Sequence, residues 1–276
     1  MLVLVAGATG NLGQKLVQSL ASRGHQVRGL GCSPEKLELK TRNLLDDFIQ
    51  YSNYYDIPAL DRACEGVDDV ICAYGIIPAL QLDGQLLLLR AAERAGINRF
   101  VADSYIRPIY IFNGVFAETL FSIPEHGHFG LDDSNIWDSN HDRIKIWGTG
   151  HEPFYWTTER DAAEFTAEIV QRDDAEKGGF WNVCSGTHSL TQTARLYEQV
   201  RNKKVTVQMM GTVEQLREIS MEARAKGNMR HYETYIGWSY QYHSISGTWI
   251  FNGLDNDKLN VQTTSLEAFL KHHPEL

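Results

Sequence analysis

Three glycines near the N-terminus carry the clearest chemical signal in the sequence. They stand in Gly7-Ala8-Thr9-Gly10-Asn11-Leu12-Gly13, between the apolar run 1–6 and an amphipathic stretch that ends near residue 23. This order predicts a buried parallel strand, a tight turn and a helix. Glycines let the backbone approach a ligand closely, and the helix start offers N–H groups to an anion. The turn is typical of a dinucleotide diphosphate site, although a plain strand-to-helix turn can use the same residues.

The first half of the chain supplies the elements that would position this turn. Apolar strands are expected at 24–30, 48–51, 69–75 and 98–102, with helices at 34–36, 57–65 and 79–95. Ser33 is expected to cap the first of these helices, with Pro34 at its first position. Strands alternating with helices predict an α/β fold with a doubly wound parallel sheet. Such sheets bind ligands at the carboxyl ends of their strands. We therefore expect one rim to carry the glycine turn, Cys32, Ser33, Asp56, Tyr74, Gly75, Asp103, Ser104 and Tyr105.

The pattern changes after Arg107. Strands are expected at 109–112, 143–147, 180–183 and 204–209, and helices at 162–172, 190–200, 213–226 and 266–270. Thr158 and Asp161 have the spacing of a capping box at the start of the 162–172 helix. We expect a dinucleotide-binding domain of residues 1–113, to which 148–187 returns. Residues 114–147 and 188–276 would form a smaller α/β substrate-side lobe.

Composition narrows the choice of partners and compartment. The formal net charge is −9 and no basic block stands out, which argues against nucleic acid or an anionic membrane as a partner. The four cysteines include no Cys-x-x-Cys pair, which suits a reducing compartment and gives no zinc signature. We find no signal-peptide pattern and no apolar run of membrane-spanning length. These features predict a cytoplasmic protein that binds a small molecule.

The end of the second strand bears on the choice of cofactor. A site for NAD usually has an acidic residue there, about 20 positions beyond the glycines, to bind the ribose 2′-hydroxyl. Here the strand ends Leu30-Gly31-Cys32-Ser33. Because no carboxylate would repel a 2′-phosphate, and Ser33 and Lys36 can donate to one, NADP is favoured and NAD is the alternative. Lys36 can equally be an ordinary solvated lysine.

Longer motifs resemble one known family. The stretches Gly7-Ala-Thr-Gly-Asn-Leu-Gly13, Gly24-His-Gln-Val-Arg28 and Ser33-Pro-Glu-Lys36 are similar to the NmrA-like branch of the atypical short-chain dehydrogenases, which includes the isoflavone reductase-like enzymes. The resemblance continues through Ile146-Trp-Gly-Thr-Gly150, Arg160-Asp-Ala-Ala163 and Ser265-Leu-Glu-Ala-Phe269. It covers nearly the whole chain and implies a Rossmann fold that binds NAD(P).

The resemblance also implies roles for individual residues. It implies that Cys32 and Ser33 face the adenosine ribose, although the family often has an arginine where Cys32 stands. It implies that Asp56 meets the adenine amino group, and that Tyr74 and Gly75 lie along the cofactor. The residues that it implies hold the diphosphate are Gly7, Thr9, Gly10, Asn11, Leu12 and Gly13.

The proton donor of the family has no counterpart in the sequence. Short-chain dehydrogenases usually use Tyr-x-x-x-Lys, in which the lysine lowers the tyrosine pKa, and this pattern occurs nowhere in the chain. The related enzymes carry a lysine on the helix after the fifth strand. Here Tyr105 runs almost directly into the strand at 109–112, too short a link for a crossover between parallel strands. Either that helix is deleted, or a mobile segment is missing from the sequence as given.

Several residues remain as candidates for chemistry or substrate binding. Ser104 and Tyr105 are the catalytic candidates, and a packed aromatic at the rim is the alternative for Tyr105. Asn113, Phe116, Tyr155 and Trp238 are the substrate candidates, with His151 and Trp156 beside Tyr155. His126 and His128 are either surface histidines or proton donors, and without a third ligand they predict no metal site. The aromatic residues that form either a substrate pocket or the core of the smaller lobe are Tyr232, Tyr235, Trp238, Tyr240, Tyr242 and Trp249.

Three functions stay open from the sequence. The first is an NAD(P)H-dependent reductase, an oxidoreductase of secondary metabolism acting on a small, aromatic or specialised-metabolite substrate. The second is a non-catalytic NAD(P)-binding regulator with a protein partner, as the resemblance to NmrA suggests. The third is a non-redox isomerase, cyclase or dehydratase on the same fold.

Overall fold

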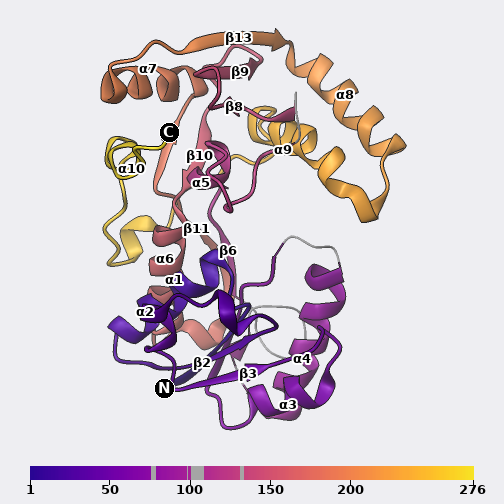
Figure 1. Cartoon of the computed structure of the whole chain (residues 1–276), viewed down its shortest axis with the longest axis vertical. Helices are drawn as coiled ribbons and strands as arrows, with labels where there is room; N and C mark the ends of the chain where they lie inside the picture. Colours follow the sequence, from indigo (N-terminus) through magenta and orange to yellow (C-terminus); the bar gives the residue numbers. More distant parts are fainter. Residues whose placement is uncertain (76–78, 98, 101–108, 131–133) are drawn as a thin grey trace. The chain divides into compact units, whose positions relative to one another are not determined.

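The computed structural model describes residues 1–75, 79–97, 99–100, 109–130 and 134–276 (Figure 1). The chain divides into two compact units, and each unit is built from three separate segments. Unit 1 contains Met1–Phe112, Ala162–Trp181 and Asp255–Val261. Unit 2 contains Asn113–Asp161, Asn182–Leu254 and Gln262–Leu276. The predicted division into a cofactor domain and a substrate lobe stays a prediction about function.

Unit 1 is organised around a parallel sheet of five strands, in the order β3-β2-β1-β4-β5. Its strands are β1 (Leu2–Ala6), β2 (Gln26–Gly31), β3 (Asp47–Gln50), β4 (Asp69–Cys72) and β5 (Arg99–Phe100). Each neighbouring pair runs parallel, with Val5 of β1 opposite Gly29 of β2 and Ile71 of β4. The central strand β1 is almost wholly buried, which explains its continuous apolar sequence. The predicted doubly wound sheet is confirmed.

Helices cover both faces of this sheet because successive side chains of a strand point to opposite faces. Val3 and Val5 pack into one cluster with α1 (Asn11–Ser22) and with α6 (Glu159–Val170). Leu4 and Ala6 pack into the other with α3 (Ile57–Cys64) and α4 (Gln85–Arg94). The shorter helical elements are η1 (Pro34–Lys36), α2 (Leu39–Arg42), the π-helical turn η2 (Leu80–Gly84), η4 (Ala175–Lys177) and η6 (Asn256–Lys258).

The strand expected after the fifth one is present but has a different partner. β6 (Ile109–Phe112) pairs with β11 (Gly179–Asn182) in a separate two-stranded sheet. Tyr110 and Phe180 stack across this pair with ring centroids 5.0 Å apart. In the part of the chain that the structure describes, β6 is therefore not a neighbour of β5 in the parallel sheet.

Unit 2 contains two three-stranded sheets. One has the order β12-β10-β7, from β7 (Val115–Phe116), β10 (Phe154–Thr157) and β12 (Gly186–His188). The other has the order β13-β9-β8, from β8 (Trp137–Asp138), β9 (Arg143–Trp147) and β13 (Thr206–Gly211). β10 runs parallel to β7 and antiparallel to β12. The expectation of a smaller α/β lobe is consistent with this arrangement.

The helices of unit 2 surround one apolar cluster that includes Trp156, Phe154, Tyr197 and Phe269. α8 and α9 lie side by side in Figure 1, and Ser220 of α8 and Ser239 of α9 have hydroxyls 3.0 Å apart. The helical elements are α5 (Ala117–Leu120), α7 (Leu190–Arg201), α8 (Val213–Lys226), η5 (Met229–Thr234), α9 (Ile236–Ile245) and α10 (Leu266–His272).

Two local predictions about helix starts need correction. α6 begins at Glu159, three residues earlier than expected, and its capping box is half formed. The Asp161 N–H donates to the Thr158 hydroxyl at 3.0 Å, but the Asp161 carboxylate binds elsewhere. Ser33 was expected to cap the next helix, and its side chain makes no capping bond. Its own carbonyl already takes the Lys36 N–H, and Pro34 has no N–H to offer.

No helix among the residues described here is long and apolar enough to cross a membrane.

Candidate functional site

The glycine turn is held tightly against the ends of two strands. The N–H groups of Gly7 and Ala8 both donate to the carbonyl of Leu30, at 2.8 and 3.2 Å. A Cβ at Gly7 would collide with the Ala73 carbonyl, and one at Gly13 would collide with the Gly7 carbonyl. Gly7 also has a φ of +83°, which favours glycine. Two of the three glycines are therefore required by the close approach of backbone to backbone.

Gly10 is the glycine that faces outward from the turn. A Cβ there meets nothing closer than the Gly7 carbonyl at 3.4 Å, and its φ of −82° suits any residue. Gly10 is the N-cap of α1 and brings no side chain to cap the helix, and no acid stands in the first turn. An uncapped, acid-free helix start behind a glycine turn suits a bound anion. The residues present therefore fit a dinucleotide diphosphate.

The end of β2 carries the groups predicted for the ribose side. Thr9 packs against it, since a Cβ at Gly31 would meet the Thr9 side chain at 3.0 Å. Cys32 is exposed, its Sγ lies 3.6 Å from the Ser33 hydroxyl, and its carbonyl accepts from the Gln50 side chain at 3.2 Å. Because Ser33 caps no helix, its hydroxyl is available to a ligand.

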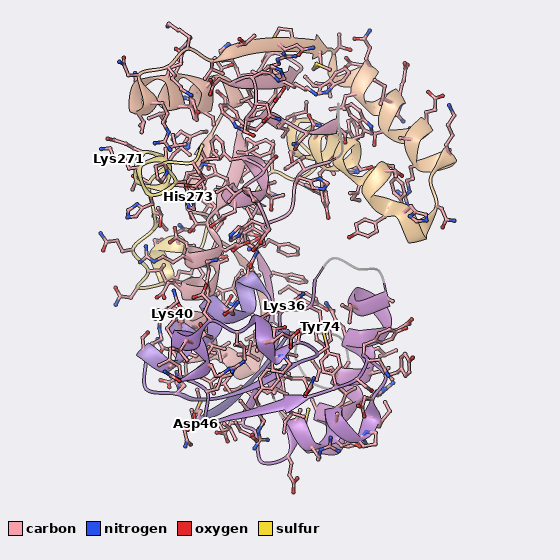
Figure 2. All side chains as sticks on the ribbon, viewed as in Figure 1. Lys36, Lys40, Asp46, Tyr74, Lys271 and His273 are labelled. Carbon is pink, nitrogen blue, oxygen red and sulfur yellow. The ribbon has the colours of Figure 1, made fainter. Side chains whose placement is uncertain are left out.

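Lys36 is exposed on η1, just beyond this strand end (Figure 2). Gln14 of α1 holds its segment, since the Gln14 amide oxygen accepts from the Glu38 N–H at 2.8 Å. Among the residues described, the Lys36 ammonium makes no ion pair, whereas the nearby Lys40 pairs with Glu38 at 2.9 Å. The ammonium of Lys36 is thus available to an anion outside the protein.

Asp56 is the N-cap of α3. Its Oδ1 accepts from the Ala59 N–H at 3.3 Å, and its Oδ2 accepts from the Ser52 N–H and hydroxyl at 3.2 and 3.1 Å. The Ser52 N–H, followed by the Ala59 N–H, holds the pKa of this carboxyl below its usual value. The implied contact with adenine stays a prediction for a residue that also caps a helix.

The main chain at Tyr74 and Gly75 lies near the glycine turn, but the Tyr74 ring packs elsewhere. A Cβ at Gly7 would lie 3.4 Å from the Tyr74 nitrogen, and a Cβ at Gly75 would meet nothing within 4 Å. The ring packs against the cluster of α3 and α4, and its buried hydroxyl has no partner among the described residues. Burial raises the pKa of Tyr74, and it raises the pKa of neighbouring Tyr51 to about 12. A role of Tyr74 towards the cofactor would therefore use its backbone.

In unit 2, three of the four predicted substrate residues come together. β7 and β10 are parallel, with Thr157 opposite Phe116, and the Thr157 hydroxyl donates to the Asn113 carbonyl. A Cβ at the intervening Gly114 would lie 2.5 Å from the Tyr155 carbonyl. Asn113, Phe116 and Tyr155 therefore belong to one small strand pair.

The fourth predicted substrate residue, Trp238 of α9, instead packs edge to face on Trp147 of β9, with centroids 6.1 Å apart. Its neighbour Tyr240 packs against the core of unit 2 and lies 6.0 Å from the ring of Phe129. Trp249, 5.6 Å from Tyr240, remains 43% exposed. Part of the aromatic stretch is therefore core, and a pocket role for the exposed part stays a prediction.

Sequence reasoning missed the acids around one of its candidate histidines. Nδ1 of His126 lies 3.0 Å from Oε2 of Glu159, the first residue of α6. Glu118 of α5 accepts the Glu159 N–H with both carboxylate oxygens at 3.1 Å. Both acids are only 4% exposed. They lie 41 positions apart in the chain, so no local pattern marks them as neighbours.

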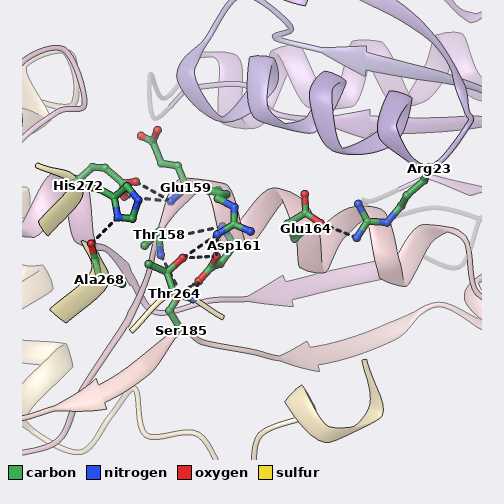
Figure 3. Close-up of polar contacts among 11 residues, drawn as sticks. Arg23, Thr158, Glu159, Asp161, Glu164, Ser185, Thr264, Ala268 and His272 are labelled. Atoms are coloured by element: carbon green, nitrogen blue, oxygen red, sulfur yellow. Dashed lines mark hydrogen bonds and ion pairs between the residues drawn. The ribbon is translucent and has the colours of Figure 1, made fainter. Parts of the chain in front are cut away.

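A third buried acid, Asp161, ties together three segments of unit 2 (Figure 3). It has no exposed surface. Its carboxylate accepts from the Ser185 hydroxyl at 2.6 Å, from the Thr264 N–H at 2.6 Å and from the Thr264 hydroxyl at 2.9 Å. The Arg160-Asp-Ala-Ala163 motif therefore has a structural role in fixing the chain around α6.

A cavity of about 330 Å³ lies beside this node in unit 2. Trp156, His188, Leu196 and Leu266 are among its lining residues. The Trp156 indole donates to Nδ1 of His188 at 3.0 Å, and burial lowers the pKa of that histidine. None of the four predicted substrate residues lines this cavity.

The two predicted catalytic residues, Ser104 and Tyr105, lie outside the described residues. No group of three or more metal-ligating side chains occurs among the residues that are described.

Comparison with known proteins identifies the domain and the fold. Residues 7–110 match a family described as NAD(P)H-binding. A curated relative, the photosystem II assembly factor Ycf39 of Synechocystis, is 25% identical over 269 residues, which span 87% of this chain and 76% of that protein. The glycine turn opens the matched domain, in agreement with its geometry.

Two solved structures show the same fold over nearly the whole chain. Isoflavone reductase superposes with a TM-score of 0.76 at 16% identity, covering 98% of both chains. An NADPH-dependent quinone oxidoreductase of Escherichia coli, solved with NADPH, superposes with a TM-score of 0.72 at 18% identity and covers 98% of this chain and 99% of that one. The expected resemblance is confirmed at the level of domain and fold.

Proposed function

We propose that this chain, which carries an NAD(P)H-binding domain on the isoflavone reductase-like fold, is an NADPH-dependent reductase of a small, aromatic or specialised-metabolite substrate. The observation that carries the proposal is the start of α1. There a glycine turn locked by backbone contacts leads into a helix without a cap or a first-turn acid. Such a helix start attracts a diphosphate.

The residues of unit 1 would bind and orient the cofactor. Gly7, Thr9, Gly10, Asn11, Leu12 and Gly13 form the turn that receives the diphosphate. Cys32, Ser33 and Lys36 stand at or just beyond the end of β2. The strand end carries no acid, and the Lys36 ammonium has no ion-pair partner among the described residues, which supports NADP over NAD. When bound, the reduced nicotinamide supplies a hydride for the reaction.

The residues of unit 2 would recognise the substrate. Asn113, Phe116 and Tyr155 share the β7–β10 strand pair, and a second group of aromatic rings includes Trp238 and the half-exposed Trp249. Aromatic rings with a few polar groups suit a planar, largely apolar molecule. This composition supports a planar, largely apolar substrate, either an aromatic compound or a quinone, which becomes aromatic when it is reduced.

The test is NADPH oxidation by the purified chain with a panel of quinones, enones and aryl alkenes. The expected result is turnover with at least one acceptor and, where the acceptor is an enone or an aryl alkene, transfer of deuterium from labelled NADPH to a carbon of the product. Calorimetry should give tighter binding of NADPH than of NADH. Binding of the dinucleotide without oxidation by any acceptor would refute the reductase. Turnover undiminished after complete removal of the cofactor would support a non-redox enzyme instead.

A second candidate is a non-catalytic dinucleotide-binding protein that assists or regulates a protein partner. The name of the curated relative, an assembly factor, favours it, as does the absence of Tyr-x-x-x-Lys from the sequence. It predicts NADPH binding, a change in partner affinity on binding, and no hydride transfer. The reductase is preferred because the fold is shared with two reductases.

The compartment is part of this proposal. Cys32, Cys64, Cys72 and Cys184 are all free thiols, and Cys32 is exposed. Free, exposed thiols suit a reducing compartment such as the cytoplasm.

A further inference from the structure

We propose that the cavity beside His188 is a binding site for a small, neutral, planar molecule that carries a carbonyl group. The inference goes beyond the proposed reductase and does not depend on it. It concerns unit 2 alone, because all the residues that line the cavity belong to that unit. Its starting point is the state of the imidazole in the cavity wall.

The contact between Trp156 and His188 fixes the position of the proton on the imidazole. An indole nitrogen can only donate a hydrogen bond, and that of Trp156 lies 3.0 Å from Nδ1 of His188. Nδ1 therefore accepts and carries no proton, so the ring is neutral and its proton is on Nε2. Burial lowers the pKa of His188, which keeps the ring neutral near pH 7.

The N–H at Nε2 is the group that His188 offers to a ligand. Nδ1 is occupied by the indole, and Nε2 makes no hydrogen bond to any residue that the structure describes. The side chain is half-buried and lines the cavity. A carbonyl oxygen would accept from this N–H without bringing a charge into a partly apolar site.

Strand pairing holds both rings in place. β10 and β12 are antiparallel, with Trp156 opposite Gly186 and Phe154 opposite His188. A Cβ at Gly186 would lie 2.9 Å from the Trp156 ring, so the absence of a side chain there leaves room for the indole. Ser189, the residue after His188, caps α7 with a complete capping box. The main chain of the histidine is therefore fixed on both sides.

The other parts of the wall are braced as well. Helices α7 and α10 each supply lining residues, and the Arg201 guanidinium of α7 donates to the Leu270 carbonyl of α10 at 2.5 Å. Ser185 lines the cavity and donates to the buried carboxylate of Asp161 at 2.6 Å (Figure 3). A wall that is already ordered reduces the entropy lost when a ligand binds.

Size and lining select the kind of ligand. An apolar cavity of about 150 Å³ holds one benzene ring. This cavity has about 330 Å³, which suits two fused rings, and Trp156, Leu196 and Leu266 supply apolar surface.

The charge of the lining argues for a neutral ligand. Among the lining residues the charged one is Glu267, which pairs with Lys271 at 2.6 Å. The hydrogen bond from Lys271 holds the pKa of Glu267 below its usual value, so this carboxylate is ionised at neutral pH. A wall with an ionised carboxylate and no cationic lining residue disfavours an anion.

The test is binding of three related probes, followed by NMR titration without NADPH. Coumarin has two fused rings and a carbonyl, chroman is the same skeleton without the carbonyl, and coumarin-3-carboxylate adds a negative charge. Wild type should bind coumarin with a Kd on the order of 1 mM or below, about tenfold more tightly than either analogue. Equal or tighter binding of chroman or of the anion would overturn the proposal, as would no binding of coumarin.

Two substitutions separate the roles of the two ring nitrogens. In His188→Asn the amide oxygen takes the place of Nδ1 and accepts from the indole, while the N–H at Nε2 is lost. In His188→Gln the amide N–H takes the place of that at Nε2. Coumarin should bind about tenfold more weakly to His188→Asn and within about threefold of wild type to His188→Gln. Equal losses in the two variants would mean that the ring serves only to pack against Trp156.

The matched control is His141→Asn, since His141 is an exposed histidine of unit 2 that pairs with Asp138 at 2.9 Å and does not line the cavity. It should bind coumarin as wild type does. Leu196→Trp should fill the cavity and abolish binding with the circular dichroism spectrum unchanged. Loss of binding in His141→Asn, or full binding in a folded Leu196→Trp, would place coumarin elsewhere and contradict the proposal.

A further measurement uses the wild-type chain. In protein that contains ¹⁵N-labelled histidine, Nδ1 of His188 should be unprotonated and Nε2 protonated at neutral pH. Coumarin should shift the resonances of the Nε2–H group of His188 and leave those of His141 unchanged. A protonated Nδ1, or an Nε2–H group that does not respond to coumarin, would refute the hydrogen bond on which the proposal depends.

Discussion

The carboxylate of Asp161 receives two hydrogen bonds from Thr264, one from its N–H at 2.6 Å and one from its hydroxyl at 2.9 Å, across 103 positions of sequence. The Ser185 hydroxyl is a third donor (Figure 3), and the Arg160 guanidinium lies 3.9 Å from the same carboxylate. The node joins three segments of unit 2 through a single side chain with no exposed surface. A charge buried so completely is stabilising only while all its donors stay in place.

Asp161→Ala should therefore destabilise the protein by about 3 kcal/mol, because it removes the shared acceptor of three hydrogen bonds from the partly buried Ser185 and Thr264. Asp161→Asn keeps one acceptor oxygen and should cost less. Urea unfolding with fixed ionic strength measures both. Asp173→Ala is the control, since Asp173 is exposed and its loss should change the free energy of unfolding by less than about 0.5 kcal/mol. Equal effects of the Ala variants at the two positions would contradict the importance of the node.

Gly10→Asp should abolish dinucleotide binding without unfolding the protein. The position tolerates a side chain, since its φ is −82° and the nearest atom to a Cβ is 3.4 Å away. The new carboxylate would cap α1 and occupy the place of the diphosphate, with the same sign of charge. Calorimetry should show at least about a 100-fold loss of NADPH affinity, or about 2.7 kcal/mol.

Gly10→Asn separates charge from size, since it has nearly the same volume and no charge, and it should bind more tightly than Gly10→Asp. Gly13→Ala provides the contrast in stability. Its Cβ would collide with the Gly7 carbonyl, so it should lower the midpoint of thermal unfolding. Unchanged affinity in Gly10→Asp would rule out the diphosphate assignment.

Lys36→Glu should lower the affinity for NADPH about tenfold, or about 1.4 kcal/mol, and leave that for NADH nearly unchanged. The reason is that its ammonium, unpaired among the residues described, would contact the 2′-phosphate, which NADPH carries and NADH lacks. Lys40→Glu is the matched control, because Lys40 is also exposed but pairs with Glu38 at 2.9 Å (Figure 2). Equal losses for the two dinucleotides in Lys36→Glu would mean a general charge effect.

Stability should fall steeply at alkaline pH because of buried tyrosines at the end of the parallel sheet. Burial raises the pKa of Tyr74, and it raises the pKa of Tyr51 to about 12. Above about pH 10, the tyrosine pKa of the unfolded chain, the unfolded state loses the phenol proton while the folded state keeps it. Deprotonation then favours the unfolded state, so the full stability is present below about pH 10 and is lost as the pH rises above that value. Tyr74→Phe should therefore unfold less readily than wild type above about pH 10.

The same variant tests the unpartnered hydroxyl at lower pH. Removing a buried hydroxyl that has no partner among the described residues should stabilise the protein near neutral pH by about 1 kcal/mol. Tyr55→Phe is the control, because Tyr55 is 61% exposed and should leave both regions of the stability curve unchanged. A destabilised Tyr74→Phe would mean that the hydroxyl has an acceptor in solution.

The sequence was informative where structure depends on neighbours along the chain. The β1 strand, the glycine turn and α1 follow one another directly, so periodicity and glycine spacing were enough to predict them. The pairing of β6 with β11 was not predicted, because the partner lies about 70 positions away and either strand is apolar enough for a parallel sheet. Ser33 stands at the predicted N-cap position, but its side chain makes no capping bond, because its carbonyl already accepts the Lys36 N–H in the short turn of η1.

The candidate site shows the same limit. The cofactor turn is contiguous and was predicted, but its chemistry depends on side chains from distant segments. His126 was singled out as a loop histidine, yet Glu159 is 33 positions away and reads in sequence as the first turn of a surface helix. Glu159 is buried in the structure, and its burial depends on packing between distant segments, which the local sequence does not show.

Unit 1 is assembled from three separate segments of the chain, which limits how it can be isolated. The match to an NAD(P)H-binding family ends at residue 110, but Ala163, Ala167 and Val170 of α6 complete the cluster that covers one face of the sheet. A fragment truncated at that boundary would expose Val3, Val5 and Leu16 to water. The module cannot be excised or transplanted as one continuous gene segment, and grafting it would require the distant helix to be supplied as well.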